Sequence, residues 1–80
     1  MRYGWKPEKN EWLREKRNIS FEEIVDALKA GGLIEWYSYI GTKEVHRNQI
    51  VLVIDINGET WKVPVTVAAT IIVMRTAYPI

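Results

Sequence analysis

The dipeptide Asn57-Gly58 separates two runs of strand-forming residues and restricts the fold of this chain more than any other feature. Residues 50–56 read IVLVIDI, and residues 59–65 read ETWKVPV, in which polar and apolar residues alternate. Asn-Gly between two such runs is the preferred two-residue turn of a β-hairpin, because both turn positions need positive φ. Pro64 cannot donate a hydrogen bond to a neighbouring strand, so we expect its strand to lie at a sheet edge or to end near one.

A second local pattern predicts a helix that starts after Ser20. Glu23 lies three residues beyond Ser20, which is the spacing of a capping box. In this motif the Ser20 hydroxyl accepts from the Glu23 N–H, and the Glu23 carboxylate reaches back to the Ser20 N–H. Ile19 and Ile24 have the spacing of a hydrophobic staple. Apolar residues then recur at the helical period and predict a core-facing stripe of Phe21, Ile24, Val25 and Leu28. The glycine pair at 31–32 ends this helix.

The remaining elements follow from the same rules. They are a short strand at 2–5, a helix at 7–17 with only Trp12 and Leu13 apolar, a strand at 33–40, a polar loop at 41–49 and a last strand at 70–80 that loses its pattern at 75–79. Helices therefore precede a run of strands, which predicts a single α+β domain over residues 1–80. We expect a short N-terminal strand, two helices, and a four-stranded antiparallel meander packed on the helices in two layers.

Composition excludes several classes of chemistry. The chain has no cysteine and one histidine, so a disulfide, a thiolate metal site and a cysteine nucleophile are excluded, and no metal or other cofactor is expected. No nucleophile motif accompanies His46. The N-terminus lacks the apolar segment of a signal peptide, and no apolar run reaches the roughly 18 residues of a membrane span. We therefore expect a cytoplasmic protein with no membrane partner.

Charge is distributed unevenly, although the net charge is only +1. The first 17 residues carry six basic and three acidic residues, a local +3, whereas residues 18–37 carry one basic and four acidic residues, a local −3. The basic residues that are candidates for a functional site fall into three groups: Lys6, Lys9, Arg14, Lys16 and Arg17 on or beside the first helix; Lys43, His46 and Arg47 in the loop; and Arg75 at the end of the last strand, followed by Tyr78.

Such a basic set suits RNA phosphates, and also the pentacovalent phosphate of metal-free RNA cleavage. His46 is the natural acid–base candidate, since its ordinary pKa lies near neutrality. A simpler interpretation stays open, in which these are solvated surface charges and Arg75 blunts a sheet edge. Likewise, Trp36, Tyr37 and Tyr39 are more typical of a core and its rim than of a base-stacking surface.

The order of motifs resembles one protein family along nearly the whole chain. Its N-terminal pattern appears as Tyr3-x-Trp5, Lys9-Asn10, Lys16-Arg17 and Ser20-Phe21-Glu22-Glu23. Later segments, RNQIVLVIDINGETWKVPV and TIIVMRTAYP, match a subgroup of the same family. These motifs resemble the BrnT-like toxins. The chain departs from the pattern in having Lys6 where an acid is usual, Arg17-Asn18-Ile19 in place of a His-Gly turn, and TAYPI where Ser/Arg-rich residues usually follow.

The resemblance implies the toxin of a type II toxin–antitoxin system with a RelE-like fold, an endoribonuclease that cleaves mRNA and arrests translation. The implied partners are RNA and a cognate antitoxin, often of the ribbon-helix-helix type. The catalytic candidates are then Lys9, Arg17, His46, Arg47 and Arg75, and the RNA-binding candidates are Lys6, Arg14, Lys16, Lys43 and Tyr78. This interpretation requires Lys9, Arg17, Arg47 and Arg75 to converge on one concave face.

The alternative is a catalytically inactive interaction or dimerisation module of the same fold. Exposed aromatic residues, of which Trp36 and Trp61 are the candidates, would allow homo-oligomers to form without the antitoxin.

Overall fold

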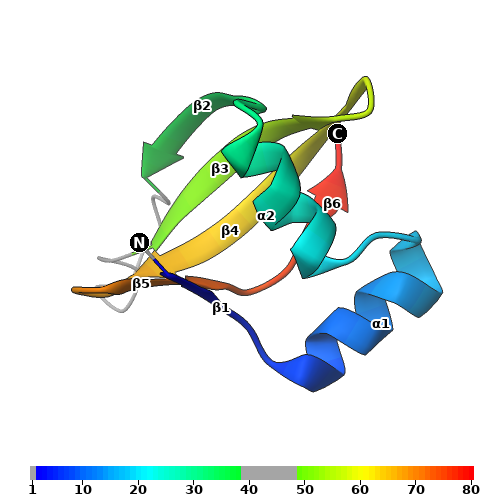
Figure 1. Ribbon diagram of the computed structural model, residues 1–80, viewed down its shortest axis with the longest axis horizontal. Helices are drawn as coiled ribbons and strands as arrows, with labels where there is room; N and C mark the ends of the chain where they lie inside the picture. Colours follow the sequence, from blue (N-terminus) through cyan, green and yellow to red (C-terminus); the bar gives the residue numbers. More distant parts are fainter. Residues whose placement is uncertain (1, 39–48) are drawn as a thin grey trace.

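A computed structural model describes residues 2–38 and 49–80 and has an α+β fold, as predicted (Figure 1). Its elements in chain order are β1 (Arg2–Gly4), α1 (Pro7–Arg17), α2 (Phe21–Lys29), β2 (Leu33–Ser38), β3 (Gln49–Ile56), β4 (Glu59–Val67), β5 (Ile71–Met74) and β6 (Tyr78–Pro79). The predicted loop residues Lys43, His46 and Arg47 lie outside the described residues, as does Tyr39.

The strands form one mixed sheet in the order β1-β5-β4-β3-β2, and β6 pairs with β4 beyond the end of β5. Strands β2 to β5 are antiparallel neighbours in chain order, whereas β1 pairs with β5 in parallel. The predicted count of four strands after the helices is wrong, because the last strand divides into β5 and β6. The N-terminal strand adds a parallel pairing that the expected antiparallel sheet lacks.

The hairpin between β3 and β4 forms at the predicted turn. Asn57 has a φ of 53° and Gly58 has a φ of 83°, so both turn residues adopt the positive φ that a two-residue hairpin needs. The register runs from Ile56 opposite Glu59 to Gln49 opposite Thr66. This hairpin forms the centre of the sheet.

Pro64 does not mark a sheet edge, because β4 has β3 on one side and both β5 and β6 on the other. On that second side, β5 pairs with residues 65–67 and β6 pairs with residues 61–62. A residue in an antiparallel ladder directs its N–H and C=O toward the same neighbour. The Pro64 carbonyl accepts from the Arg75 N–H at 3.0 Å, so the missing N–H faces the junction between β5 and β6.

The start of α2 is fixed by its cap. The Ser20 hydroxyl accepts from the Glu23 N–H at 3.2 Å, and it donates to the Glu23 carboxylate at 3.3 Å. The first bond of the predicted capping box is thus confirmed. In the second, the Glu23 carboxylate accepts from the Ser20 hydroxyl and not, as predicted, from the Ser20 N–H. Ile19 and Ile24, the two staple residues, are both buried in the core.

The end of α2 is a Schellman motif. Gly31 has a φ of 85° and donates to the Leu28 carbonyl at 3.2 Å, while the Gly32 N–H donates to the Ala27 carbonyl at 2.8 Å. The Gly32 carbonyl then accepts from the Asp55 N–H at 2.9 Å. The glycine pair therefore ends the helix and also ties its last turn to β3.

The core lies between the helices and one face of the sheet, which we call the helix face. In Figure 1, α2 lies across β3 and β4, and α1 lies near the start of α2. The core cluster joins Leu13 of α1 and Phe21 and Ile24 of α2 to alternate residues of β3 and β4, namely Leu52, Ile54, Trp61, Val63 and Val65. Trp61 is only 5% exposed, so its predicted exposure is wrong, whereas Trp36 on β2 is 61% exposed.

Candidate anion-binding site

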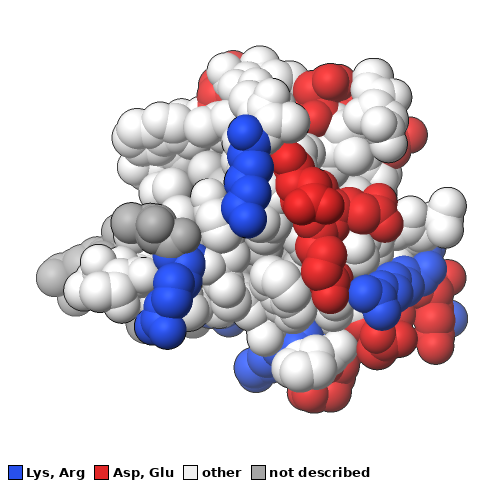
Figure 2. Space-filling view, viewed as in Figure 1, with Lys and Arg blue, Asp and Glu red and all other residues white. Residues whose placement is uncertain are grey.

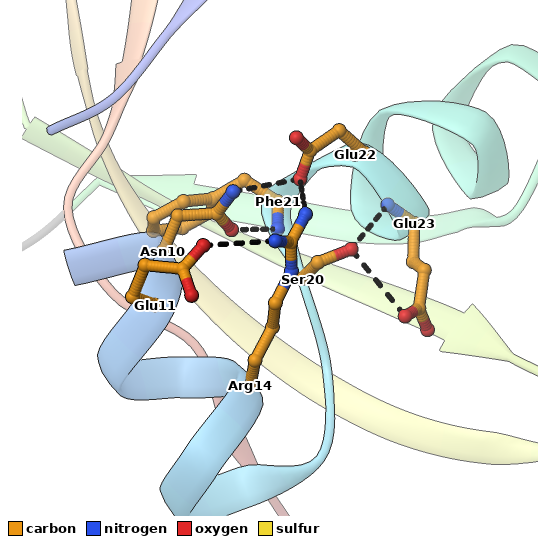
Figure 3. A network of polar contacts seen from close by, with 7 residues as sticks. All are labelled: Asn10, Glu11, Arg14, Ser20, Phe21, Glu22 and Glu23. Atoms are coloured by element: carbon orange, nitrogen blue, oxygen red, sulfur yellow. Dashed lines mark hydrogen bonds and ion pairs between the residues drawn. The ribbon is translucent and has the colours of Figure 1, made fainter. Parts of the chain in front are cut away.

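The two helices are joined by a buried polar side chain, Asn10, which is only 5% exposed (Figure 3). Its Nδ2 donates to Glu22 Oε1 at 2.7 Å, and its Oδ1 accepts from the Phe21 N–H at 2.8 Å. The Phe21 N–H belongs to the first turn of α2, which has no intrahelical partner for it. Asn10 thus satisfies the start of α2 from α1, a role that the pattern of the first helix does not predict.

Arg14 also connects the two helices, through the same Glu22 carboxylate that Asn10 contacts. Its guanidinium pairs with Glu11 at 2.8 Å and with Glu22 at 3.2 Å (Figure 3). Glu11 lies three residues before Arg14, a helical spacing that suits a charge pair. Because two carboxylates already compensate this charge, Arg14 does not belong to the group of free cations that we expected for RNA binding.

Trp12 carries two of the predicted catalytic cations on its ring. Lys9 Nζ lies 3.9 Å from the ring centroid, and the Arg17 guanidinium carbon lies 4.8 Å from it. Arg17 also donates to the Thr76 hydroxyl at 3.4 Å and to the Ala77 carbonyl. Arg17 therefore connects α1 to residues 75–77, the segment between β5 and β6.

A hollow of about 320 Å³ opens beside this stack, lined by Lys6, Lys9, Met74 and Arg75. Lys6 immediately precedes α1, Lys9 lies in its first turn, and Arg75 follows β5. Arg75 also donates to the Thr66 hydroxyl at 3.3 Å. Three positive side chains from distant parts of the sequence thus surround one hollow, which suits a phosphate or a short stretch of phosphodiester backbone.

The other candidates lie elsewhere. Lys16 does not line this hollow, and Lys43, His46 and Arg47 lie outside the described residues. Tyr78 pairs with Lys62 across β6 and β4, on the sheet face opposite the helix face, which we call the second face. Tyr78 is not among the residues that line the hollow.

The predictions missed Lys62, a basic residue at a polar position of β4. Its Nζ lies 5.7 Å from the centroid of the Tyr37 ring. Hydrogen bonding to Tyr37 raises the pKa of Lys62, and the charges of Tyr37, Tyr78 and Glu35 act in the same direction. The only sequence signal for this contact is the alternation of ETWKVPV, which gives the face of Lys62 but not its neighbours.

A larger hollow of about 500 Å³ has the opposite charge. Glu23, Asp26 and Asp55 line it at the side of α2. Figure 2 shows acidic side chains gathered along α2 on this face. Within residues 2–38 and 49–80, no group of three His, Cys, Asp or Glu side chains is placed to hold a metal ion. An anion is therefore favoured at the basic hollow and repelled here.

Comparison with known proteins adds no relative: no family model, curated protein or solved structure matches this chain. Among the helices of the described part of the chain, none is long and apolar enough to cross a membrane. The fold and site thus define an α+β protein with a three-cation hollow at the junction of α1 and β5.

The contacts of Asn10 and Arg14 with the Glu22 carboxylate should make the stability of the fold depend on pH. The pKa of Glu22 is lowered from its ordinary value of 4.5, chiefly because Asn10 donates to its carboxylate. A lowered pKa in the folded state gives stability that is present above the unfolded pKa and is lost as pH falls through the folded pKa. We expect Glu22→Gln to lower the free energy of unfolding more at about pH 7 than at about pH 3.

Chemical denaturation at the two pH values measures this difference, which should be small because the Glu22 side chain is 52% exposed. Glu15→Gln removes the same charge from an exposed position of α1 and is the control. Equal losses for Glu22→Gln at both pH values would contradict the role of its ionised form.

Proposed function

We propose that this chain is the toxin of a type II toxin–antitoxin system, with a RelE-like fold, and that it cleaves mRNA without a metal ion. The convergence of Lys6, Lys9 and Arg75 around one hollow is the observation that carries this proposal. Arg17 lies next to the hollow, since it shares the Trp12 ring with Lys9 and contacts Thr76, the neighbour of Arg75. The three described residues of the expected concave set thus lie in one region.

In this mechanism the RNA backbone lies along the hollow, and the side chains of Lys9 and Arg75 neutralise the scissile phosphate. The 2′-oxygen attacks the adjacent phosphorus as its proton passes to a base, and the 5′-oxygen leaves as it gains a proton, which gives a 2′,3′-cyclic phosphate and a 5′-hydroxyl. Cations around the phosphate stabilise the charge that develops in the transition state. We assign the acid–base role to His46 and a further cationic role to Arg47.

Binding of single-stranded RNA tests the first part of this proposal. Three phosphate contacts predict that the logarithm of the binding constant falls with the logarithm of salt concentration with a slope of about −2. We expect Arg75→Ala to weaken binding and to make this slope shallower by about 0.7. Fluorescence anisotropy of a labelled oligonucleotide over a salt series measures both quantities.

Lys29→Ala is the matched control, because it removes one positive charge from the last turn of α2, away from the hollow. Its slope should equal that of the original chain. If both variants change the slope equally, binding depends on net charge and the hollow is not the site.

Induced expression in cells tests cleavage itself. The original chain should slow growth and deplete message, and Arg75→Ala should relieve both effects while its circular dichroism spectrum stays unchanged. Co-purification with the product of the adjacent gene should yield the small ribbon-helix-helix antitoxin that this proposal requires. Unfolding of Arg75→Ala would instead assign the Arg75 side chain a structural role, through its hydrogen bond to the Thr66 hydroxyl.

A second candidate function is favoured by β2, whose six residues are all exposed and include Ile34 and Trp36. An exposed apolar strand of this kind suits a protein-interaction module that has no catalytic activity. Normal growth with intact RNA on induced expression would support this candidate over the toxin.

A further inference from the structure

The two edges of the sheet differ in how they are protected from pairing with another chain. Strand β1 forms one edge with three residues, of which Arg2 is charged and Gly4 has no side chain. Strand β2 forms the other edge with six residues, and Glu35 is its only charge. Short or charged edges resist strand addition, whereas a longer apolar edge favours it. Within residues 2–38 and 49–80 no strand pairs with the outer side of β2, so β2 is the edge that favours a partner strand.

Four of the six exposed side chains of β2 are large hydrophobic residues, and they occur on both faces of the sheet. Trp36 lies opposite Leu52 and therefore projects on the helix face, yet it is 61% exposed. Tyr37 lies opposite Val51 on the second face, and Leu33 and Ile34 are also exposed. Exposed apolar side chains gathered on one strand are typical of a protein interface, and Trp and Tyr are among the residues that contribute most to binding there.

We propose that β2 pairs with β2 of a second copy of this chain, antiparallel and in the same plane, so that one sheet continues through both copies. This inference concerns the edge of the sheet and is independent of RNA cleavage. A two-fold axis gives an isologous interface, in which each contact occurs twice. The partner is a second copy because the charges and aromatic residues of β2 complement one another in one register.

Facing residues of an antiparallel pair project on the same face of the sheet. A two-fold axis between the two β2 strands must therefore lie beside one residue that faces the same residue of the second copy, and we name the axis after that residue. An axis at Glu35 would place two carboxylates opposite each other, which is destabilising. An axis at Tyr37 would place Trp36 opposite Ser38 and lose the contact between tryptophans. An axis at Trp36 pairs the two tryptophans on the helix face and pairs Glu35 with Tyr37 on the second face.

The register centred on Trp36 also complements charge. Lys62 lies beside Tyr37, with its Nζ 5.7 Å from the ring centroid. Tyr37 faces Glu35 of the second copy in this register, so each Lys62 approaches a carboxylate of the other chain. The register shift between Leu33 and Glu35 leaves Ile34 outside regular pairing, so the paired segment starts at Glu35. The interface is therefore short, and it depends on the aromatic pair at its centre.

Sedimentation of the full chain over a concentration series tests the dimer. We expect a reversible monomer–dimer equilibrium, and we expect Trp36→Lys to raise its dissociation constant roughly 30-fold or more, the effect of losing a central tryptophan. Ile80→Lys is the matched control, because Ile80 is 73% exposed and lies outside β2. A chain that is monomeric at all concentrations, or a dimer that Trp36→Lys leaves intact, overturns the proposal.

Cysteine crosslinking tests the register, since the chain has no cysteine of its own. A mixture of Glu35→Cys and Tyr37→Cys chains should form a disulfide-linked dimer on mild oxidation, because the two positions face each other. Either variant alone should crosslink little, because its two cysteines are offset by two residues and lie about 8 Å apart, beyond the reach of a disulfide. Efficient crosslinking of either variant alone, or none in the mixture, contradicts the register.

Discussion

Replacing Phe21 with alanine is expected to lower the free energy of unfolding by about 3–5 kcal/mol. Among the residues that the structure describes, Phe21 has the largest fully buried side chain. It is the first residue of α2, and its ring lies 5.5 Å from the ring of Trp5, centroid to centroid. A domain of 80 residues has a total stability of roughly 4–12 kcal/mol. This single change therefore removes a large part of the stability, because the cavity lies where α2 meets the sheet.

Urea denaturation followed by tryptophan fluorescence measures the change. Ile80→Ala is the control, since it shortens an exposed apolar side chain and should alter stability by less than about 0.5 kcal/mol. Phe21→Leu should fall between the two, because it retains part of the buried volume. A loss below about 1 kcal/mol for Phe21→Ala would mean that α2 does not pack on the sheet as described.

The position of Phe21 was predictable because the signals around it are local. Ser20 and Glu23 place the start of the helix, and the glycine pair at 31–32 places its end, through bonds within a few residues of chain. The hairpin at Asn57-Gly58 is local for the same reason. The boundaries of these elements depend on residues that are neighbours in the sequence, so they can be predicted before any tertiary contact is known.

Pairings between distant segments were not predictable from the sequence. Strand β1 pairs with β5, about seventy residues away, and no local pattern identifies that neighbour. The last strand divides at residues 75–77, where Arg17 of α1 contacts Thr76 and Ala77. The interior position of Pro64 depends on β5 and β6, which pair with the two ends of β4. Trp61 is buried because it packs in the core cluster with residues of both helices.

In the candidate site, too, residue types were predictable from the sequence, whereas contacts between distant segments were not. The sequence identified Lys6, Lys9 and Arg75 as candidate cations, and these three residues line one hollow. It also grouped Arg14 with them, although Arg14 is paired with two carboxylates. A run of charges gives residue types but not partners, because Glu22 approaches Arg14 only after α2 has packed against α1. For the same reason, the bridging role of Asn10 gave no recognisable signal.

Replacing Asn10 with alanine is expected to lower the free energy of unfolding by about 3 kcal/mol. The change leaves the Phe21 N–H buried without its acceptor and removes the bond to the Glu22 carboxylate. An unsatisfied buried donor costs about 1–3 kcal/mol, and a hydrogen bond to a charged group contributes about 1.5–3 kcal/mol. Urea denaturation near neutral pH measures the loss, and Glu15→Ala, at an exposed position of the same helix, is the control for removing a polar side chain from α1.

Asn10→Asp separates hydrogen bonding from packing, because aspartate has nearly the same shape as asparagine. The introduced carboxylate still accepts from the Phe21 N–H, but it cannot donate to Glu22, whose oxygen lies 2.7 Å from Asn10 Nδ2. Two carboxylates at this distance repel, which raises the folded-state pKa of the introduced group. The variant should therefore gain stability relative to the original chain as pH falls, since protonation restores a donor. A pH-independent deficit would mean that Asn10 contributes shape alone and that the helices are joined by other contacts.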